Sequence, residues 1–258
     1  MTDSTVNTYE GSFARAYDQH WGSYARESGL RILEYFVSHP AARPDARVLD
    51  LGCGSGQLAL LFLQAGWGVV GVDRSTDMLA LAQKNCHSFV TTGKAVFHKA
   101  DLRTFKINAP FILVTATYNV MNHLVSESDL SSCFKRTHEH LIKPGLFVFD
   151  LNTRRGLRQW DGQERESNER IAYVAKGTYD EERGQATLRM EGSYLRADGN
   201  PEPFAHTTLN QAFDLARVES LLKASDFTKV HFSLPTDLGT PLKEPEKEMR
   251  VFVVAEKV

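Results

Sequence analysis

Two aspartates, Asp50 and Asp73, stand before and after a glycine-rich loop at spacings that could bring both carboxylates to one ligand. Asp50 ends an apolar run two residues before Gly52, and glycine recurs at Gly54 and Gly56. Glycine lets the backbone approach a ligand closely, and a following helix aims its N–H groups at that ligand. Asp73 comes 73 − 50 = 23 positions after Asp50, about the offset at which an acid binds ribose hydroxyls. A carboxylate at Asp50 would repel a pyrophosphate but attract positive charge.

A strand, the loop and a helix must position these groups. Residues 47–51 are nearly all apolar, as in a strand covered on both faces, and residues 57–65 are apolar almost all round, as in a buried helix. A dinucleotide fingerprint needs glycine or alanine at its sixth place, which is Gln57 here, and a P-loop needs a lysine that this loop lacks. S-adenosylmethionine (SAM) is a nucleoside with a sulfonium, an ammonium and no phosphate, so it fits the pattern.

Residues 48–56, Val-Leu-Asp-Leu-Gly-Cys-Gly-Ser-Gly, resemble motif I of the class I SAM-dependent methyltransferases. The resemblance implies an α/β fold, a Rossmann-like class I methyltransferase with a seven-stranded, mostly parallel sheet. It places Asp50, Gly52, Cys53 and Gly54 in the SAM site. A small residue that merely fits the turn is the alternative for Cys53.

The second and third predicted strands are residues 68–73 and 95–100. The same resemblance assigns the rest of the SAM site to residues at the ends of these strands or after them. Asp73 is expected to accept hydrogen bonds from both ribose hydroxyls, with Arg74 beside it. Met78 is expected to lie against the adenine, although core packing explains it equally well. Asp101 is expected to accept from the adenine amino group, next to the backbone N–H of Leu102; an exposed turn residue is the alternative.

Residues 9–36 have helical spacing and an aromatic face. That face is formed by Phe13, Tyr17, Trp21 and Tyr24. Much of it should pack on the main domain, but the segment resembles the opening of small-molecule methyltransferases, in which tyrosines cover the SAM and substrate pocket. We therefore expect Tyr17 to contact SAM and take part in catalysis, Tyr24 to contact SAM, and Arg26 to pair with the SAM carboxylate.

A polar loop follows the fourth predicted strand, residues 111–116, at the edge where open α/β sheets bind ligands. Thr117 begins it and is expected to contact SAM. Asn122 and His123 resemble the substrate-facing loop of small-molecule N- and O-methyltransferases. His123 is a candidate to take a proton from an amine or hydroxyl, and a histidine bonded to backbone is the alternative.

The chain changes character after residue 152. Three segments with turn-type links are predicted to be antiparallel strands: residues 170–180, 185–196 and 202–213. We interpret residues 153–213 as a β-lid that excludes water, with His206 facing the substrate; a dimer interface is the alternative. Residues 1–152 would form the N-terminal helices and SAM-binding core, and residues 214–258 the helix and strands that complete it.

Composition is that of an ordinary globular protein, with 42% hydrophobic residues and a formal net charge of −2. The charge gives no reason to expect nucleic acid or a membrane as a partner. Cys53, Cys86 and Cys133 are too few for a disulfide framework and lack metal-binding spacing, so we expect no metal. We find neither a signal peptide nor a membrane span, and expect a cytoplasmic monomer or homodimer.

The resemblance implies in-line transfer of a methyl group from SAM to a small-molecule acceptor. The aromatic segment with Asn122 and His123 suits an amine, as in sugar-amine or glycine-type enzymes, so N-methylation is the favoured hypothesis. An O-methyltransferase, an NAD-dependent oxidoreductase and a non-catalytic SAM-binding protein remain alternatives, although Gln57 argues against NAD.

Overall fold

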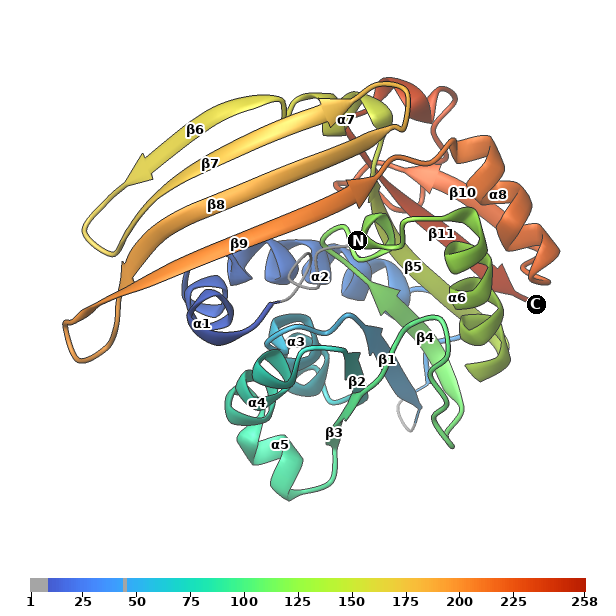
Figure 1. Cartoon of the computed structure of the whole chain (residues 1–258). Coiled ribbons are helices and arrows are strands. Elements are labelled where there is room, and N and C mark those ends of the chain that lie inside the picture. Colours follow the sequence, from blue (N-terminus) through green and yellow to red (C-terminus); the bar gives the residue numbers. More distant parts are fainter. Residues whose placement is uncertain (1–8, 44–45) are drawn as a thin grey trace.

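The computed structural model describes residues 9–43 and 46–258 of the chain (Figure 1). The helices in these residues are α1 (Gly11–His20), α2 (Gly22–Val37), α3 (Gln57–Gln64), α4 (Thr76–Asn85), α5 (His87–Thr91), α6 (Glu127–His140), α7 (Arg154–Arg158) and α8 (Leu215–Ala224), with 3-10 turns η1 (Met121–His123) and η2 (Pro245–Lys247). The strands are β1 (Arg47–Leu51), β2 (Gly68–Asp73), β3 (Ala95–Lys99), β4 (Phe111–Ala116), β5 (Leu141–Asn152), β6 (Gly162–Ser167), β7 (Ile171–Asp180), β8 (Gln185–Leu195), β9 (Pro201–Gln211), β10 (Lys229–Ser233) and β11 (Arg250–Lys257).

The larger sheet has seven strands in the order β10-β11-β5-β4-β1-β2-β3. Strands β1 to β5 are parallel, while β11 pairs antiparallel with β5 and β10 antiparallel with β11. The chain order reverses between β1 and β4, so the carboxyl ends of these strands border a crevice of the kind in which open α/β sheets bind ligands. The predicted Rossmann-like, mostly parallel sheet is therefore confirmed.

Helices cover both faces of this sheet, which explains why its central strands are almost wholly apolar. Every residue of β4 is buried. On one face, Phe134 of α6 and Val218 of α8 belong to one core cluster, and on the other, Phe36 of α2 and Phe62 of α3 belong to a second. Because the parallel strands are held rigidly between two apolar layers, the loops at their carboxyl ends start from fixed positions.

A second, antiparallel sheet has the order β6-β7-β8-β9 and lies over α1 (Figure 1). Phe13 and Ala16 of α1 share a buried cluster with Ile171, Ala175 and Met190 of β7 and β8. The aromatic face of the N-terminal segment is thus sandwiched against the second sheet. This arrangement places the N-terminal aromatic residues between the two sheets.

Three elements differ from the sequence-based predictions. The helix expected over residues 9–36 is two helices, because Trp21 leaves helical geometry with φ −115° and ψ 4°. The second sheet has a fourth strand, β6, whose residues are all exposed and so lack the alternation that reveals a half-buried strand. The apolar run of residues 146–150 predicts the fifth strand, but β5 begins at Leu141, five residues earlier.

Candidate active site

The loop after β1 is shaped by three glycines with positive φ angles. Gly52, Gly54 and Gly56 have φ of +65°, +51° and +79°, a region that other residues rarely adopt. A Cβ at Gly52 would lie 2.6 Å from a methyl carbon of Val120, whereas a Cβ at Gly54 would enter open space. The bare backbone of Gly52 and Gly54 forms one wall of a cavity of about 610 Å³ at the carboxyl ends of the parallel strands.

Asp73, the last residue of β2, faces this cavity and fixes the loop. Its Oδ2 accepts a hydrogen bond from the Gly54 N–H at 2.9 Å, and its Oδ1 accepts from the Ser75 N–H at 2.8 Å. Burial raises the pKa of Asp73, and these two backbone bonds oppose the shift. Each carboxylate oxygen can accept a second hydrogen bond, so the group is arranged to bind a pair of hydroxyls.

Asp50 lies beneath the loop and is only 3% exposed. Its Oδ1 accepts from the Thr115 hydroxyl at 2.9 Å, while its Oδ2 has no hydrogen-bond partner in the described part of the chain. Burial raises the pKa of Asp50 to about 7. A buried acceptor without a partner costs free energy unless a ligand or water satisfies it. Asp50 acts from beneath the loop, and it is the free accepting positions of Asp73 beside the bare glycine backbone that fit the ribose and the methionine end of SAM.

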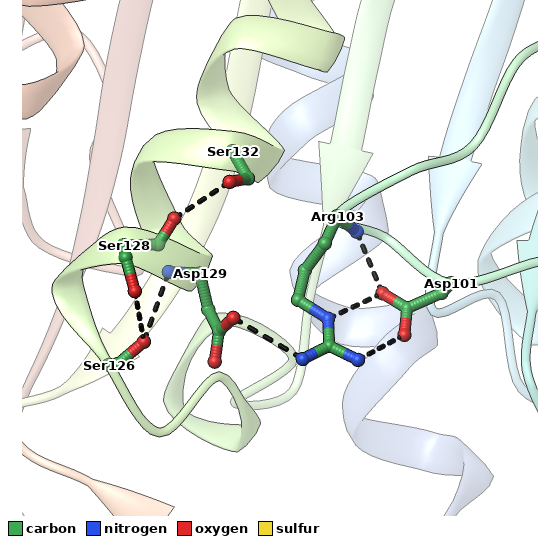
Figure 2. Close-up of polar contacts among 6 residues, drawn as sticks. All are labelled: Asp101, Arg103, Ser126, Ser128, Asp129 and Ser132. Atoms are coloured by element: carbon green, nitrogen blue, oxygen red, sulfur yellow. Dashed lines mark hydrogen bonds and ion pairs between the residues drawn. The ribbon is translucent and has the colours of Figure 1, made fainter.

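Asp101, Arg103 and Asp129 also line the cavity, and Figure 2 shows the contacts that join them. Arg103 donates from Nε to Asp101 at 2.9 Å and from a terminal nitrogen to its other oxygen at 2.6 Å, and it reaches Asp129 of α6 at 3.3 Å. The Arg103 guanidinium lowers the pKa of Asp101. Asp129 is itself placed by the start of α6, where its N–H donates to Ser126. Arg103 therefore holds the Asp101 carboxylate ionised and in a fixed orientation.

A strained turn carries the fourth-strand loop into the cavity. Tyr118 and Asn119 have φ of +69° and +64°, which is uncommon for residues with side chains. Asp150 of β5 is fully buried and accepts from the Asn119 N–H at 3.1 Å and from the Tyr24 hydroxyl at 3.2 Å. It also pairs with Arg250, whose guanidinium lies 4.7 Å from the Tyr24 ring. This network holds the Tyr118 ring at the cavity wall.

His123 occupies the 3-10 turn η1 at the inner end of the cavity. Its Nδ1 lies 3.4 Å from the Leu209 carbonyl, which can only accept, and 3.5 Å from the Thr208 hydroxyl, which can accept or donate, so the carbonyl assigns the proton to Nδ1. Its Nε2 then faces the Tyr9 hydroxyl at 3.5 Å as the acceptor. Burial lowers the pKa of His123 to about 4, so the imidazole is neutral at physiological pH. Burial also raises the pKa of Tyr9, which keeps its hydroxyl a donor.

Ten residues proposed from the sequence line this one cavity. They are Tyr17, Gly52, Gly54, Asp73, Arg74, Met78, Asp101, Leu102, Thr117 and His123. They come from α1, from the β1–α3 loop, and from the carboxyl ends of β2, β3 and β4 or just beyond them. The topology thus brings together groups that lie up to 106 positions apart in the chain, from Tyr17 to His123 (123 − 17 = 106).

The structure does not bring two proposed substrate-binding residues to the cavity. Asn122 is fully buried, and its amide donates to the carbonyls of Asn152 and Gln211 at 3.0 and 2.8 Å, joining β5 to β9. His206 of β9 lies behind Phe13, with the two rings stacked at 3.8 Å. Both side chains support the walls from outside.

Four proposed SAM-binding residues also lie apart from the cavity wall. Tyr24 points to Asp150 and supports the strained turn, and Arg26 is exposed on α2. Cys53 is buried under the glycine loop, close to Asp50. Asp50 lies beneath the same loop, and its Oδ2 has no hydrogen-bond partner among the described residues.

Sequence reasoning missed several residues that shape the site. Tyr9 and Tyr118 line the cavity, Arg103 orients Asp101, and Asp150 holds the turn. Tyr118 follows the proposed Thr117 directly, so its place after β4 was a usable signal. Nothing in the local sequence pairs Asp150 with Arg250, which is 100 positions away.

The described residues show neither a metal-binding cluster nor a membrane-spanning helix. Within residues 9–43 and 46–258, no group of three or more His, Cys, Asp and Glu side chains is arranged to hold a metal ion. Over the same ranges, no helix combines the length and apolar character needed to cross a bilayer.

Comparison with known proteins gives a consistent family. Residues 48–145 match the family model described as a methyltransferase domain. A putative methyltransferase of a Geobacillus species is 31% identical over 146 residues, which are 57% of this chain and 58% of that one. A dTDP-3-amino-3,6-dideoxy-α-D-glucopyranose N,N-dimethyltransferase of Streptomyces fradiae is 31% identical over 147 residues, 55% of this chain and 54% of that one. The chain therefore matches little more than half the length of these relatives.

The fold extends beyond that shared segment. The crystal structure of a SAM-dependent methyltransferase from Clostridium acetobutylicum superposes with a TM-score of 0.80 at 20% identity, covering 95% of this chain and 97% of that one. At that identity the likeness establishes the fold, and it includes the region of the second sheet. Together with the glycine loop and the acid after β2, these comparisons lead to one conclusion: residues 48–145 match a methyltransferase domain, and the chain as a whole has the fold of a SAM-dependent methyltransferase.

Proposed function

We propose that the chain transfers a methyl group from SAM to the nitrogen of a small-molecule amine. The observation that carries this proposal is the state of His123, a buried imidazole at the cavity wall with its pKa lowered to about 4. So weak a base removes a proton from an alkyl hydroxyl poorly, whereas an amine in its neutral form attacks with its own lone pair. The name of the similar Streptomyces fradiae enzyme, an N,N-dimethyltransferase, also supports nitrogen as the acceptor atom.

We also propose SAM-binding roles for the side chains that line the cavity, and their positions support these roles. Asp73 would accept hydrogen bonds from the two ribose hydroxyls, and Met78 would pack against the adenine, whose amino group would donate to Asp101. The unpartnered oxygen of Asp50 would face the positively charged methionine end, directly or through water. When bound, SAM supplies a methyl group on a positively charged sulfur, and Tyr17 would shield that end from water.

The Tyr9–His123 pair would hold the amine rather than deprotonate a hydroxyl. With the His123 proton on Nδ1, the Tyr9 hydroxyl would donate a hydrogen bond to His123 Nε2 at 3.5 Å, and the Tyr9 oxygen would accept one from an amine N–H. An amine held in that way keeps its lone pair directed toward the methyl group. Fixing the two reactants in line accounts for much of the rate enhancement available to such a reaction.

The test is a competition among acceptors that share a carbon skeleton and differ in the nucleophilic group. The protein is incubated with methyl-labelled SAM and with matched amines, alcohols and thiols, and the labelled product is identified by mass spectrometry. We expect label on the amine, and a lower kcat with unchanged affinity for S-adenosylhomocysteine (SAH) in His123→Asn. Label on the alcohol alone would contradict the proposal, as would tight SAM binding without turnover of any acceptor.

A further inference from the structure

A second cavity of about 530 Å³ adjoins the first and lies between α1 and the second sheet. Its walls come from α1, from β7 and β8, and from the segment of residues 159–164 that leads into β6. Tyr9, Tyr17 and Tyr118 line both cavities, so they mark the junction between them. A cavity of this volume is large enough to enclose a small organic ligand.

Aromatic rings dominate the walls of this second cavity. Trp21 and Tyr173 approach to 5.5 Å between ring centroids, and Phe13 lies 6.0 Å from Trp21. At the junction, Tyr17 lies 5.3 Å from Tyr9 and 6.0 Å from Tyr118. Such walls bind an apolar body by contact and attract a cation through the electron-rich ring faces.

The charged groups of the second cavity all have one sign. Asp161 and Glu164 line its rim, and the described residues that line it include no lysine, arginine or histidine. A third carboxylate, Glu166, accepts a hydrogen bond from the Tyr173 hydroxyl at 2.7 Å. Two guanidinium groups lie outside this second cavity: that of Arg250 is 5.8 Å from the Tyr118 ring and is paired with Asp150, and Arg74 lines the first cavity.

We propose that this second cavity is the acceptor site and that it takes amines with a hydrophobic, ring-containing body and no carboxylate or phosphate. An anionic group within it would lie among carboxylates and aromatic faces without a positively charged partner, which is unfavourable in a desolvated site. Free amino acids such as glycine, and sugar amines linked to a nucleotide diphosphate, are accordingly poor acceptors. This inference rests on the proposed N-methylation and narrows its substrate class.

The same arrangement accounts for the protonation steps. The acids at the rim attract the ammonium form, and the aromatic walls deeper in the cavity disfavour it, because burial lowers the pKa of an amine. The proton therefore leaves to solvent and the neutral amine reaches the junction. There its lone pair forms the new N–C bond while the C–S bond breaks and its electron pair stays on sulfur. The product is a methylated ammonium, which carries the positive charge out past the same acids.

The test compares three indole compounds that differ in one group: tryptamine, tryptophan and tryptophol. Binding of each to the SAH complex is measured by calorimetry, and methyl transfer from SAM is measured in parallel. We expect tryptamine to bind at least tenfold more tightly than tryptophan, because the carboxylate of tryptophan would lie close to the acidic side chains of the cavity. Equal or tighter binding of tryptophan, or no detectable binding of tryptamine, overturns the inference.

A charge change at the rim provides a second measurement. Glu164→Lys should weaken tryptamine binding and narrow its advantage over tryptophan by roughly fivefold, with affinity for SAH unchanged. Glu182→Lys, in the exposed β7–β8 turn, is the matched control and should leave both ligands unaffected. If Glu164→Lys prefers tryptamine over tryptophan by the same factor as the wild-type protein, the inference is overturned.

The two proposals fail in different ways. N-methylation of tryptophan in preference to tryptamine would end the inference about acceptor class but leave N-methylation standing. Methylation of tryptophol with no transfer to either amine would end the proposed function itself.

Discussion

Replacing Asp73 by Asn tests the assignment of the ribose site most sharply. The Asp73 carboxylate accepts from Gly54 and Ser75 at 2.9 and 2.8 Å and retains one accepting position on each oxygen. Asparagine keeps the shape but removes the charge and turns one acceptor into a donor. Hydrogen bonds to charged groups contribute about 1.5–3 kcal/mol each, so losing one should weaken SAH binding roughly ten- to a hundredfold.

The assay is calorimetric titration with SAH and with its 2′,3′-dideoxy analogue. The wild-type protein should bind SAH much more tightly than the analogue, and Asp73→Asn should bind the two nearly alike. Asp198→Asn, in the exposed β8–β9 hairpin, serves as the control for a lost carboxylate. If Asp73→Asn weakened both ligands equally, the carboxylate would be acting only through the glycine loop, and the ribose assignment would be refuted.

Three further changes probe the remaining parts of the SAM site. Burial raises the pKa of Asp50 to about 7 in the folded protein, so the folded state holds this proton more tightly than the unfolded state does. The free energy of unfolding therefore falls as the pH rises from about 4, below which both states are protonated, to about 7, above which both are ionised. Chemical denaturation should therefore show wild type losing more stability than Asp50→Asn between about pH 4 and 7; parallel curves would contradict this. Arg103→Met should weaken SAH binding about three- to tenfold but spare the analogue without the adenine 6-amino group, and equal losses in titration would count against an orienting role. Gly52→Ala should lower stability by about 1–3 kcal/mol in thermal melts, because its Cβ would meet Val120 at a positive φ, and adding Val120→Ala should restore part of it. A neutral Gly52→Ala would show that the loop is not constrained there.

The sheet was predictable wherever burial leaves a clear pattern. Strand β4 has the predicted bounds, Phe111–Ala116, because a strand covered on both faces is a continuous apolar run. The end of β2 at Asp73 was also foreseen, since an acid interrupts such a run. Strand β6 was not, because all its residues are exposed and nothing periodic remains to detect.

The site was predictable where a residue follows a parallel strand, and less so where tertiary contacts decide its direction. Asp73 and Thr117 end or follow strands, and both line the cavity. Asn122 is equally polar, but its side-chain amide donates to the backbone carbonyls of Asn152 and Gln211 instead of facing the cavity. The sequence alone does not indicate which way a side chain in a short 3-10 turn will point. The positive φ of Tyr118 was also hidden, since glycine is the residue that usually signals it.

The second cavity depends on packing between distant segments, and so no local pattern revealed it. Trp21 comes from the break between α1 and α2, and Tyr173 from β7, yet their rings lie 5.5 Å apart. The aromatic spacing of residues 13–24 predicted a buried helix face, but the partner that covers it, the second sheet, was visible only in the structure.

A crystal structure of the protein with SAH and tryptamine would test the central claim most directly. Our account predicts the ribose on Asp73, the sulfur directed toward the junction lined by Tyr9, Tyr17 and Tyr118, and the indole ring in the second cavity. A nucleoside bound elsewhere, or a junction closed by side chains so that sulfur and amine cannot approach, would contradict it.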